Sequence, residues 1–185
     1  MLIDELKIHL KAGNGGAGVE RWRHEKGKEL AGPGGGNGGK GGDVFVRAIR
    51  DIGGLLRYRH VKELSAGKGG DGENFGRHGK NGIDLFLELP VGSVIVNAET
   101  HEQFELLKED ETLKILQGGR GGLGNEHFKT SFNTSPHEST PGSVGEMADF
   151  SIELRLFADV GVIGLPNAGK SSLLNVLSAA HAKVG

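Results

Sequence analysis

The chain has 185 residues, of which 34 are glycine and 36% are apolar, and its formal net charge is −2. This low net charge excludes a disordered polyelectrolyte, and the five prolines exclude a collagen-like chain, which needs far more proline and an unbroken glycine repeat. Cysteine is absent, which excludes disulfides and cysteine-based metal sites. No apolar run approaches the ~18 residues of a membrane span, and the N-terminus lacks a secretory signal, so we expect a cytoplasmic protein.

Short alternating or β-branched runs predict strands along the first 157 residues. Residues 6–11 alternate between apolar and polar side chains, as expected for a half-buried strand. Residues 98–101 have the composition of a hairpin turn. No long helical pattern occurs before residue 170, so this part of the chain is predicted to be mainly β. Further strands are predicted at residues 43–49, 85–89, 93–97, 113–116 and 152–156.

Thirty of the glycines precede residue 150, and 25 of these lie in three clusters, at residues 13–42, 67–82 and 118–124. Within the clusters many glycines recur at every third position, as Gly35, Gly38 and Gly41 do. Three residues per turn is the repeat of the left-handed polyproline-II helix, and glycine along one side lets neighbouring helices approach closely. A flexible linker is the alternative. The preserved phase, and the strand-like runs between clusters, favour a bundle of extended helices.

Basic residues gather in or beside the glycine clusters. Residues 1–80 carry 15 Lys and Arg against 10 Asp and Glu, whereas residues 81–185 carry 7 against 14. Loops with Arg and Lys can follow a phosphate backbone, which predicts RNA binding; a solvated surface is the alternative. Trp22 is predicted either to stack on a base or to anchor a loop. The candidate RNA-binding residues are Arg21, Trp22, Arg23, Lys26, Lys28, Lys40, Lys68, Arg77, Lys80, Arg120 and Lys129.

Residues 164–171 match the phosphate-loop pattern G-x-x-x-x-G-K-[ST]. An apolar run at 159–163 predicts a preceding strand, and residues 172–182 predict a following helix, which is the context that the motif requires. Lys170 is expected to reach the β- and γ-phosphates of a nucleotide, and the Ser171 hydroxyl to complete a Mg²⁺ shell. The predicted nucleotide-binding residues are Gly164, Leu165, Pro166, Asn167, Ala168, Gly169, Lys170, Ser171 and Ser172.

The phosphate loop lies near the end of the sequence, with 14 residues after Ser171. A complete nucleotide-binding domain needs further strands, an aspartate near Mg²⁺ and residues that read the base. We therefore expect residues 1–157 to form one domain and residues 158–185 to be the first part of a second, which by itself binds nucleotide weakly or not at all. The phosphate loop alone leaves three functions open: a GTPase, an ATPase or small-molecule kinase, and a scaffold with a vestigial loop.

Several segments together resemble the Obg family of GTPases, and the resemblance covers nearly the whole chain. The segments are the glycine-rich stretch 32–44, residues 84–92, the motif 118–125 and the phosphate loop directly after residues 158–161. The resemblance implies a mainly β Obg fold, in which a glycine-rich bundle of left-handed polyproline-II-type helices stands on a small β-barrel. It implies that the first strand, phosphate loop and helix of a truncated α/β GTPase domain follow.

The resemblance also implies a function. Obg proteins act in late assembly of the large ribosomal subunit, where the glycine-rich loops contact rRNA and the GTPase domain is a nucleotide switch. The implied cofactors are GTP or GDP and Mg²⁺, with Ser171 as the magnesium ligand, and guanine tetraphosphate is a further implied ligand. The resemblance places the catalytic residues outside this sequence, and we expect a monomer.

Overall fold

The computed structural model describes residues 5–24, 31–155, 163–165 and 168–177. The chain divides into two compact units, residues 1–155 and residues 156–185, and each is described by itself. Among the described residues, the first unit holds the strands and the second holds the helix α1 (Lys170–Leu177). None of the described helices has the length and apolar character that a membrane crossing requires.

The strands of the first unit form two sheets. The five-stranded sheet has the order β3 (Glu63–Ser65), β1 (Glu5–Lys11), β8 (Met147–Leu154), β5 (Ser93–Asn97) and β6 (Gln103–Glu105). The three-stranded sheet has the order β4 (Leu85–Pro90), β2 (Val44–Ile49) and β7 (Thr112–Leu116). The β1–β3 and β2–β4 pairs are parallel, and the other pairs are antiparallel. Two short 3-10 helices also occur, η1 (Gly54–Tyr58) and η2 (Asn125–Phe128).

Alternate side chains from the two sheets meet in one hydrophobic core. In β1 every second residue is buried, and its partners on β8 are buried too: Leu6 lies opposite Ile152, and Ile8 lies opposite Phe150. A sheet with one covered face produces this alternation because successive side chains of a strand point to opposite faces. The second sheet contributes Val44, Val46, Ala48, Leu87, Leu89 and Leu116 to the same core.

The predicted strands are confirmed, with three differences in detail. β8 begins at Met147, five residues before the predicted start at 152, because the alternation already begins there: Ala148 and Phe150 are buried, and Asp149 between them is exposed. β3 and β6 were not predicted, since each has only three residues and lies at an edge of the sheet. The turn at 98–101 is confirmed as the link between β5 and β6, where His101 has a φ of 58°.

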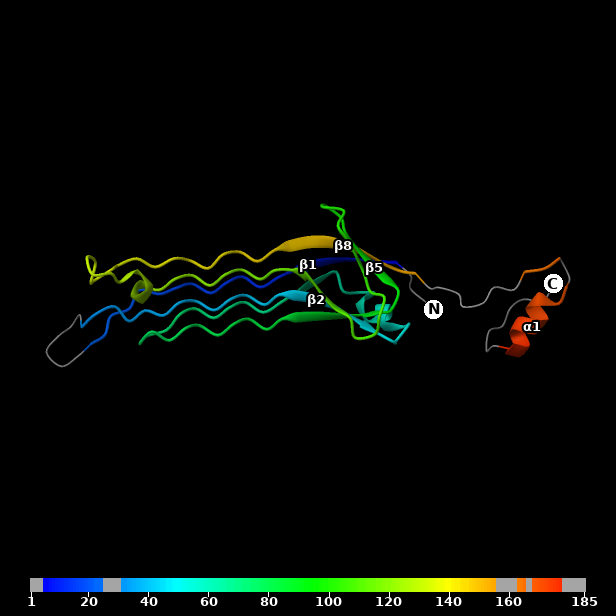
Figure 1. The fold of residues 1–185 in the computed structure, drawn as a ribbon, viewed down its shortest axis with the longest axis horizontal. Helices are drawn as coiled ribbons and strands as arrows, with labels where there is room; N and C mark the ends of the chain where they lie inside the picture. The colour runs from blue at the N-terminus through cyan, green and yellow to red at the C-terminus, as the bar shows by residue number, and fades with distance from the viewer. Residues whose placement is uncertain (1–4, 25–30, 156–162, 166–167, 178–185) are drawn as a thin grey trace. The chain divides into compact units, whose positions relative to one another are not determined.

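Six extended, glycine-rich segments form a bundle beside the sheets (Figure 1). Each segment continues a strand: three follow β1, β3 and β7, and three lead into β2, β4 and β8. We call them together the glycine bundle, and we call its end away from the sheets the bundle tip. The segments span residues 12–20, 33–43, 66–73, 76–84, 117–125 and 140–146.

The glycine bundle keeps the strand order of the sheets in two layers. The segments that continue β3, β1 and β8 form one layer, and those that continue β4, β2 and β7 form the other. Backbone hydrogen bonds join the layers at every third residue: the N–H of Gly13 donates to the carbonyl of Gly42, and that of Gly16 to Gly39, both at 2.9 Å. This step of three confirms the predicted packing of extended helices.

Glycine is required in the bundle where two backbones touch. A Cβ on Gly38 would overlap the carbonyl oxygen of Gly16, and a Cβ on Gly121 would overlap that of Gly38. A neighbouring backbone cannot move aside without losing its own hydrogen bonds. Gly34 is different, because a Cβ there would meet the flexible side chain of Arg23.

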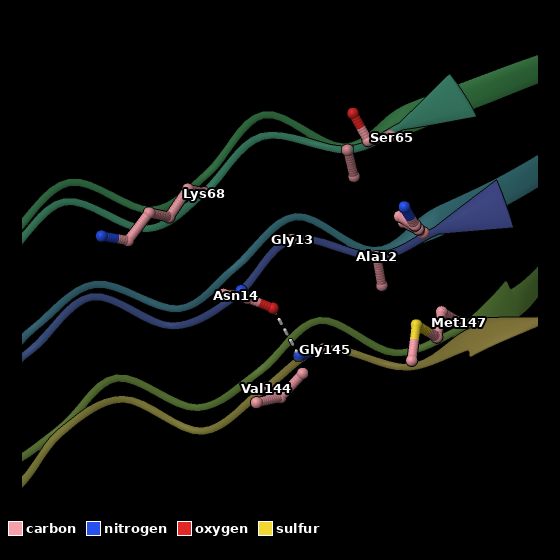
Figure 2. A pocket seen from close by; sticks show the side chains of 10 residues that line it. Ala12, Gly13, Asn14, Ser65, Lys68, Val144, Gly145 and Met147 are labelled. Atoms are coloured by element: carbon pink, nitrogen blue, oxygen red, sulfur yellow. Dashed lines mark hydrogen bonds between the residues drawn. The ribbon is translucent and has the colours of Figure 1, made fainter. Parts of the chain in front are cut away.

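The change from strand to extended helix occurs where the bundle leaves the sheets (Figure 2). Residues 12–14 run between the segment that follows Ser65 and the segment that precedes Met147, and a cavity of about 290 Å³ opens beside them. The side-chain oxygen of Asn14 accepts a hydrogen bond of 3.0 Å from the N–H of Gly145. Polar side chains therefore take over part of the backbone pairing at this junction.

Candidate functional site

The candidate RNA-binding cations fall into two groups along the glycine bundle. Those at the bundle tip, or in the loops that close it, are Arg21, Arg23, Arg77 and Lys129. Those within five residues of a strand end, nearer to the sheets, are Lys40, Lys68, Lys80 and Arg120. Lys26 and Lys28 lie outside the described residues. The structure therefore brings together only part of the predicted set.

Three of these cations have acidic partners, and the longest of these ion pairs joins Lys68 Nζ to Asp71 Oδ1 at 3.7 Å. Arg23 Nη2 lies 2.8 Å from Glu126 Oε1 at the bundle tip. Lys40 Nζ lies 2.7 Å from Asp43 Oδ2, and its side chain is half-buried near β2. Arg77 and Lys129, by contrast, are exposed, and no ion pair involves them within the described part of the chain. Exposed cations at a loop end can meet a phosphate without first breaking an ion pair.

Asn125 joins the loops at the bundle tip. Its side chain is fully buried, and its Nδ2 donates to the carbonyls of Arg21 and Pro136 at 3.0 and 3.2 Å. Its Oδ1 accepts hydrogen bonds from the N–H groups of Gly35 and Arg21, at 2.8 and 3.4 Å. One amide thus satisfies backbone groups from three separate segments, which a non-polar side chain cannot do.

Trp22 is half-buried in the same region. Its Nε1 donates to Glu20 Oε1 at 3.2 Å, and its ring centroid lies 4.8 Å from that of His137. Glu20 also contacts His137 at 2.8 Å, and these hydrogen bonds, first the one with His137, lower the pKa of the glutamate. Of the two predicted roles of Trp22, these contacts favour the loop anchor.

Asp43 marks the end of the bundle nearest to the sheets. It is buried, and its Oδ1 accepts the N–H of Gly118 at 2.7 Å while both oxygens contact Lys40 Nζ. Burial alone would raise the pKa of Asp43, but the hydrogen bonds from Lys40 and Gly118, with the nearby charge of Lys114, outweigh burial and lower it. The carboxylate is therefore charged at neutral pH and ties two segments together.

Two aromatic side chains at the bundle tip were not predicted. Phe75, in the loop between two bundle segments, is 71% exposed, and Phe132, in the loop after η2, is fully exposed. Arg21, Arg77 and Phe75 line the same cavity of about 430 Å³. The sequence signal that could have indicated Phe75 is an aromatic residue inside a run of glycine and polar residues.

In the second unit, the described residues of the phosphate loop are 163–165 and 168–171. Gly169 has a φ of 75°, and among the described atoms nothing lies within 4 Å of the position of a Cβ there. Lys170 Nζ contacts the carbonyl oxygens of Gly164 and Leu165, at 2.9 and 2.6 Å. The lysine therefore folds over the loop, where its ammonium group could instead meet a phosphate.

The helix after the loop begins two residues earlier than predicted. α1 includes Lys170 and Ser171, and the N–H of Leu173 donates to the carbonyl of Gly169 at 2.9 Å. The open left-handed glycine and the helix start directly after it fit a nucleotide phosphate, and the Ser171 hydroxyl suits Mg²⁺. Pro166 and Asn167 lie outside the described residues, as do residues 159–162 of the predicted strand and residues 178–182 of the predicted helix.

A glycine-bundle unit followed by a phosphate loop that leads into a helix defines a class of P-loop nucleotide-binding proteins with a glycine-rich N-terminal domain. The comparison with known families makes the class specific. The GTP1/OBG family model matches residues 3–156, and the chain belongs to this family. The family model described as "50S ribosome-binding GTPase" matches residues 159–185. The fold is thus the mainly β Obg fold, joined to the start of a GTPase domain, as predicted.

One curated relative illustrates the similarity. The chain is 46% identical over 183 residues to "GTPase Obg" of Persephonella marina (strain DSM 14350 / EX-H1). The alignment covers 98% of this chain and 54% of the relative, so the chain spans about half the length of that protein. The matched half includes the glycine bundle and the phosphate loop.

Proposed function

We propose that the full-length protein is a GTP-binding and GTP-hydrolysing assembly factor of the large ribosomal subunit, acting in the cytoplasm as a monomer. Residues 1–157 bind rRNA with the bundle tip, and the domain that begins at residue 158 is the nucleotide switch. One observation carries the proposal: a rigid bundle with cations at its tip and a phosphate loop occur in the same chain. Membership of the GTP1/OBG family supports both halves.

The proposed ligands of the second domain are GTP or GDP with Mg²⁺. Residues 164–172 surround the phosphates, the Lys170 ammonium moves from the loop carbonyls to the phosphate oxygens, and Ser171 ligates Mg²⁺. Guanine tetraphosphate has the same 5′-diphosphate as GDP, so the same loop is its proposed site.

The nucleotide half is tested in the full-length protein by titration with GTP and with ATP in the presence of Mg²⁺. We expect Lys170→Ala to weaken GTP binding about 10- to 150-fold, because it removes a charge-assisted hydrogen bond to phosphate. Glu63→Gln, an exposed change in the first unit, is the control and should leave the affinity unchanged. A preference for ATP would replace the GTPase by an ATPase or kinase, and unchanged function of the Lys170→Ala protein in cells would favour a scaffold.

The rRNA half is tested by co-sedimentation of the full-length protein with large ribosomal subunits over a range of salt concentrations. Replacing Arg21, Arg77 and Lys129 together by Glu changes the bundle tip, and replacing Lys68, Lys80 and Arg120 together by Glu makes the same change in charge nearer to the sheets. We expect the tip variant to bind more weakly and to reduce the slope of log affinity against log salt by about 2 to 3. Equal binding by the tip variant and the unaltered protein would contradict the proposal.

A further inference from the structure

Phe75 occupies a backbone position that does not suit it. Its φ is 61°, and Gly76 directly after it has a φ of 70°, so two successive residues are left-handed. Glycine, asparagine and aspartate adopt such turns readily, whereas a bulky side chain is strained there. The strain is not repaid by burial, because 71% of the phenylalanine is exposed. An outlier of this kind points to a function outside the fold.

The turn that carries Phe75 is firmly held. The N–H of Glu73 donates to the carbonyl of Arg77 at 2.9 Å, which closes the turn. The N–H of Gly76 donates to the carbonyl of Gly34 at 2.8 Å, which fixes the turn to the neighbouring bundle segment. The phenyl ring is therefore presented from a fixed backbone and loses little freedom when it binds a partner.

Charged and polar groups surround the ring on one side. A cavity of about 430 Å³ is lined by Phe75 together with Arg21, Arg77, Glu73, Asn74 and Gly72. Both arginines are exposed, and they lie more than 50 positions apart in the chain. The cavity thus combines an apolar face with two cations, one carboxylate and one amide.

We propose that Phe75 is a stacking platform for one unpaired base of RNA, with Arg21 and Arg77 contacting the adjoining phosphates. Exposed bases of single-stranded RNA stack on aromatic rings, and arginines pair with their phosphates. The Asn74 amide and the Glu73 carboxylate lie in the same cavity and can hydrogen-bond the edge of the base or a 2′-hydroxyl. This inference rests on the proposed rRNA binding and names the contact that would carry it.

A nucleic acid suits this cavity better than an apolar peptide. Two arginines at its rim favour a partner that alternates flat apolar groups with negative charges, which is the pattern of bases and phosphates. Glu73 is the single carboxylate of the lining, so the cavity keeps a net positive charge. Contact with a ribosomal protein is the competing outcome, and crosslinking from position 75 distinguishes it from contact with RNA.

The first test measures binding of the full-length protein to large ribosomal subunits. We expect Phe75→Ala to weaken binding about 5- to 150-fold, the range for loss of one stacked base, and Phe75→Tyr to retain it. Phe75→Asn relieves the backbone strain, so it should leave the melting temperature unchanged or higher while weakening binding as Ala does. Ile83→Ala changes an exposed apolar residue at the sheet end of the bundle segment that follows Phe75; it is the matched control and should not change binding.

The second test identifies the partner by placing a photo-crosslinking benzoylphenylalanine at position 75 in the full-length protein and irradiating it with large subunits. Crosslinks to a single-stranded nucleotide of rRNA are expected. Crosslinks to ribosomal protein alone, or full binding by both Phe75→Ala and Phe75→Asn, would overturn the inference while leaving the proposed function intact. If the unaltered protein itself fails to bind subunits, the proposed function fails and the inference fails with it.

Discussion

In the two sheets, side chains from alternate positions meet in a shared core, whereas in the glycine bundle the backbones themselves meet. Leu10 and Ile95 are fully buried among other side chains. Gly38, in contrast, lies against the carbonyl of Gly16, with no space for a side chain between them. The same six chain segments pass from one kind of packing to the other within two or three residues.

The difference shows what each region can tolerate. A core of side chains can adjust when one changes, because neighbouring side chains rotate and partly refill the space. A bundle of backbones that are hydrogen-bonded at every third residue has no such freedom, since paired carbonyls, such as that of Gly16, are already held by their own partners. The bundle is therefore rigid although it buries few apolar side chains. This rigidity suits a structure that must hold side chains in fixed positions at the bundle tip.

The largest effect is expected inside the bundle. Gly38→Ala places a Cβ onto the carbonyl oxygen of Gly16, so we expect it to lower the free energy of unfolding by about 4 kcal/mol or more. Gly34→Ala is the matched control, because its Cβ meets only the side chain of Arg23, and we expect about 1 kcal/mol or less. Urea denaturation of both variants measures the difference. Equal losses would show that the bundle yields to side chains as a core does.

The next effect is expected in the sheets. Leu10→Ala removes a fully buried side chain from the core, and we expect it to lower the free energy of unfolding by about 2 to 5 kcal/mol. Leu10→Met keeps the volume and should lower it by less than about 1.5 kcal/mol. We expect only the sheets to retain stability in this way when a side chain is replaced by one of similar volume. If Leu10→Met lowered the free energy of unfolding as much as Leu10→Ala does, the sheets would be as intolerant of substitution as the bundle.

The sequence predicts the elements of both regions, because each region has its own period. Alternation at 6–11 identifies β1, and the step of three at Gly35, Gly38 and Gly41 identifies an extended helix. The period does not say which segment lies beside which, since every glycine-rich segment offers the same face. The two-layer order follows from the strand pairing, which depends on contacts between residues up to about 150 positions apart.

The candidate site follows the same division. The phosphate loop could be read from spacing because Gly164, Gly169 and Lys170 act within one short stretch of chain. The cavity beside Phe75 could not, because it needs Arg21, which reaches the tip from another bundle segment. The role of Asn125 likewise depends on the carbonyls of Arg21 and Pro136, which the fold alone brings to it.

A smaller effect is expected at the bundle tip, where the buried side chain of Asn125 forms hydrogen bonds with backbone groups of separate segments. Asn125→Ala leaves the N–H of Gly35 and the carbonyls of Arg21 and Pro136 without this partner, so we expect a loss of about 2 to 3 kcal/mol. Hydrogen exchange should show the loss as faster exchange at the tip, with the amides of β1 and β8 little changed. Uniformly faster exchange in the sheets would show that the two regions unfold as one unit.

The smallest effect is expected at the junction of the two regions and depends on pH. The pKa of Asp43 is lowered in the folded protein relative to the unfolded chain. Its carboxylate therefore contributes stability that is full above the unfolded pKa of about 4 and is lost as pH falls through the folded pKa.

Asp43→Asn tests this contribution. The asparagine can still accept the N–H of Gly118 but loses the ion pair with Lys40, and we expect a loss of about 1 to 2 kcal/mol at pH 7. The difference between the two proteins should shrink as the pH is lowered below 4, because the protonated aspartic acid then resembles asparagine. Glu63→Gln, which removes an exposed partner of Lys11, is the control and should leave stability almost unchanged, because water and salt screen an exposed ion pair. A difference between the Asp43→Asn variant and the unaltered protein that stays constant down to low pH would mean that the shape of this side chain, and not its charge, joins the bundle to the sheets.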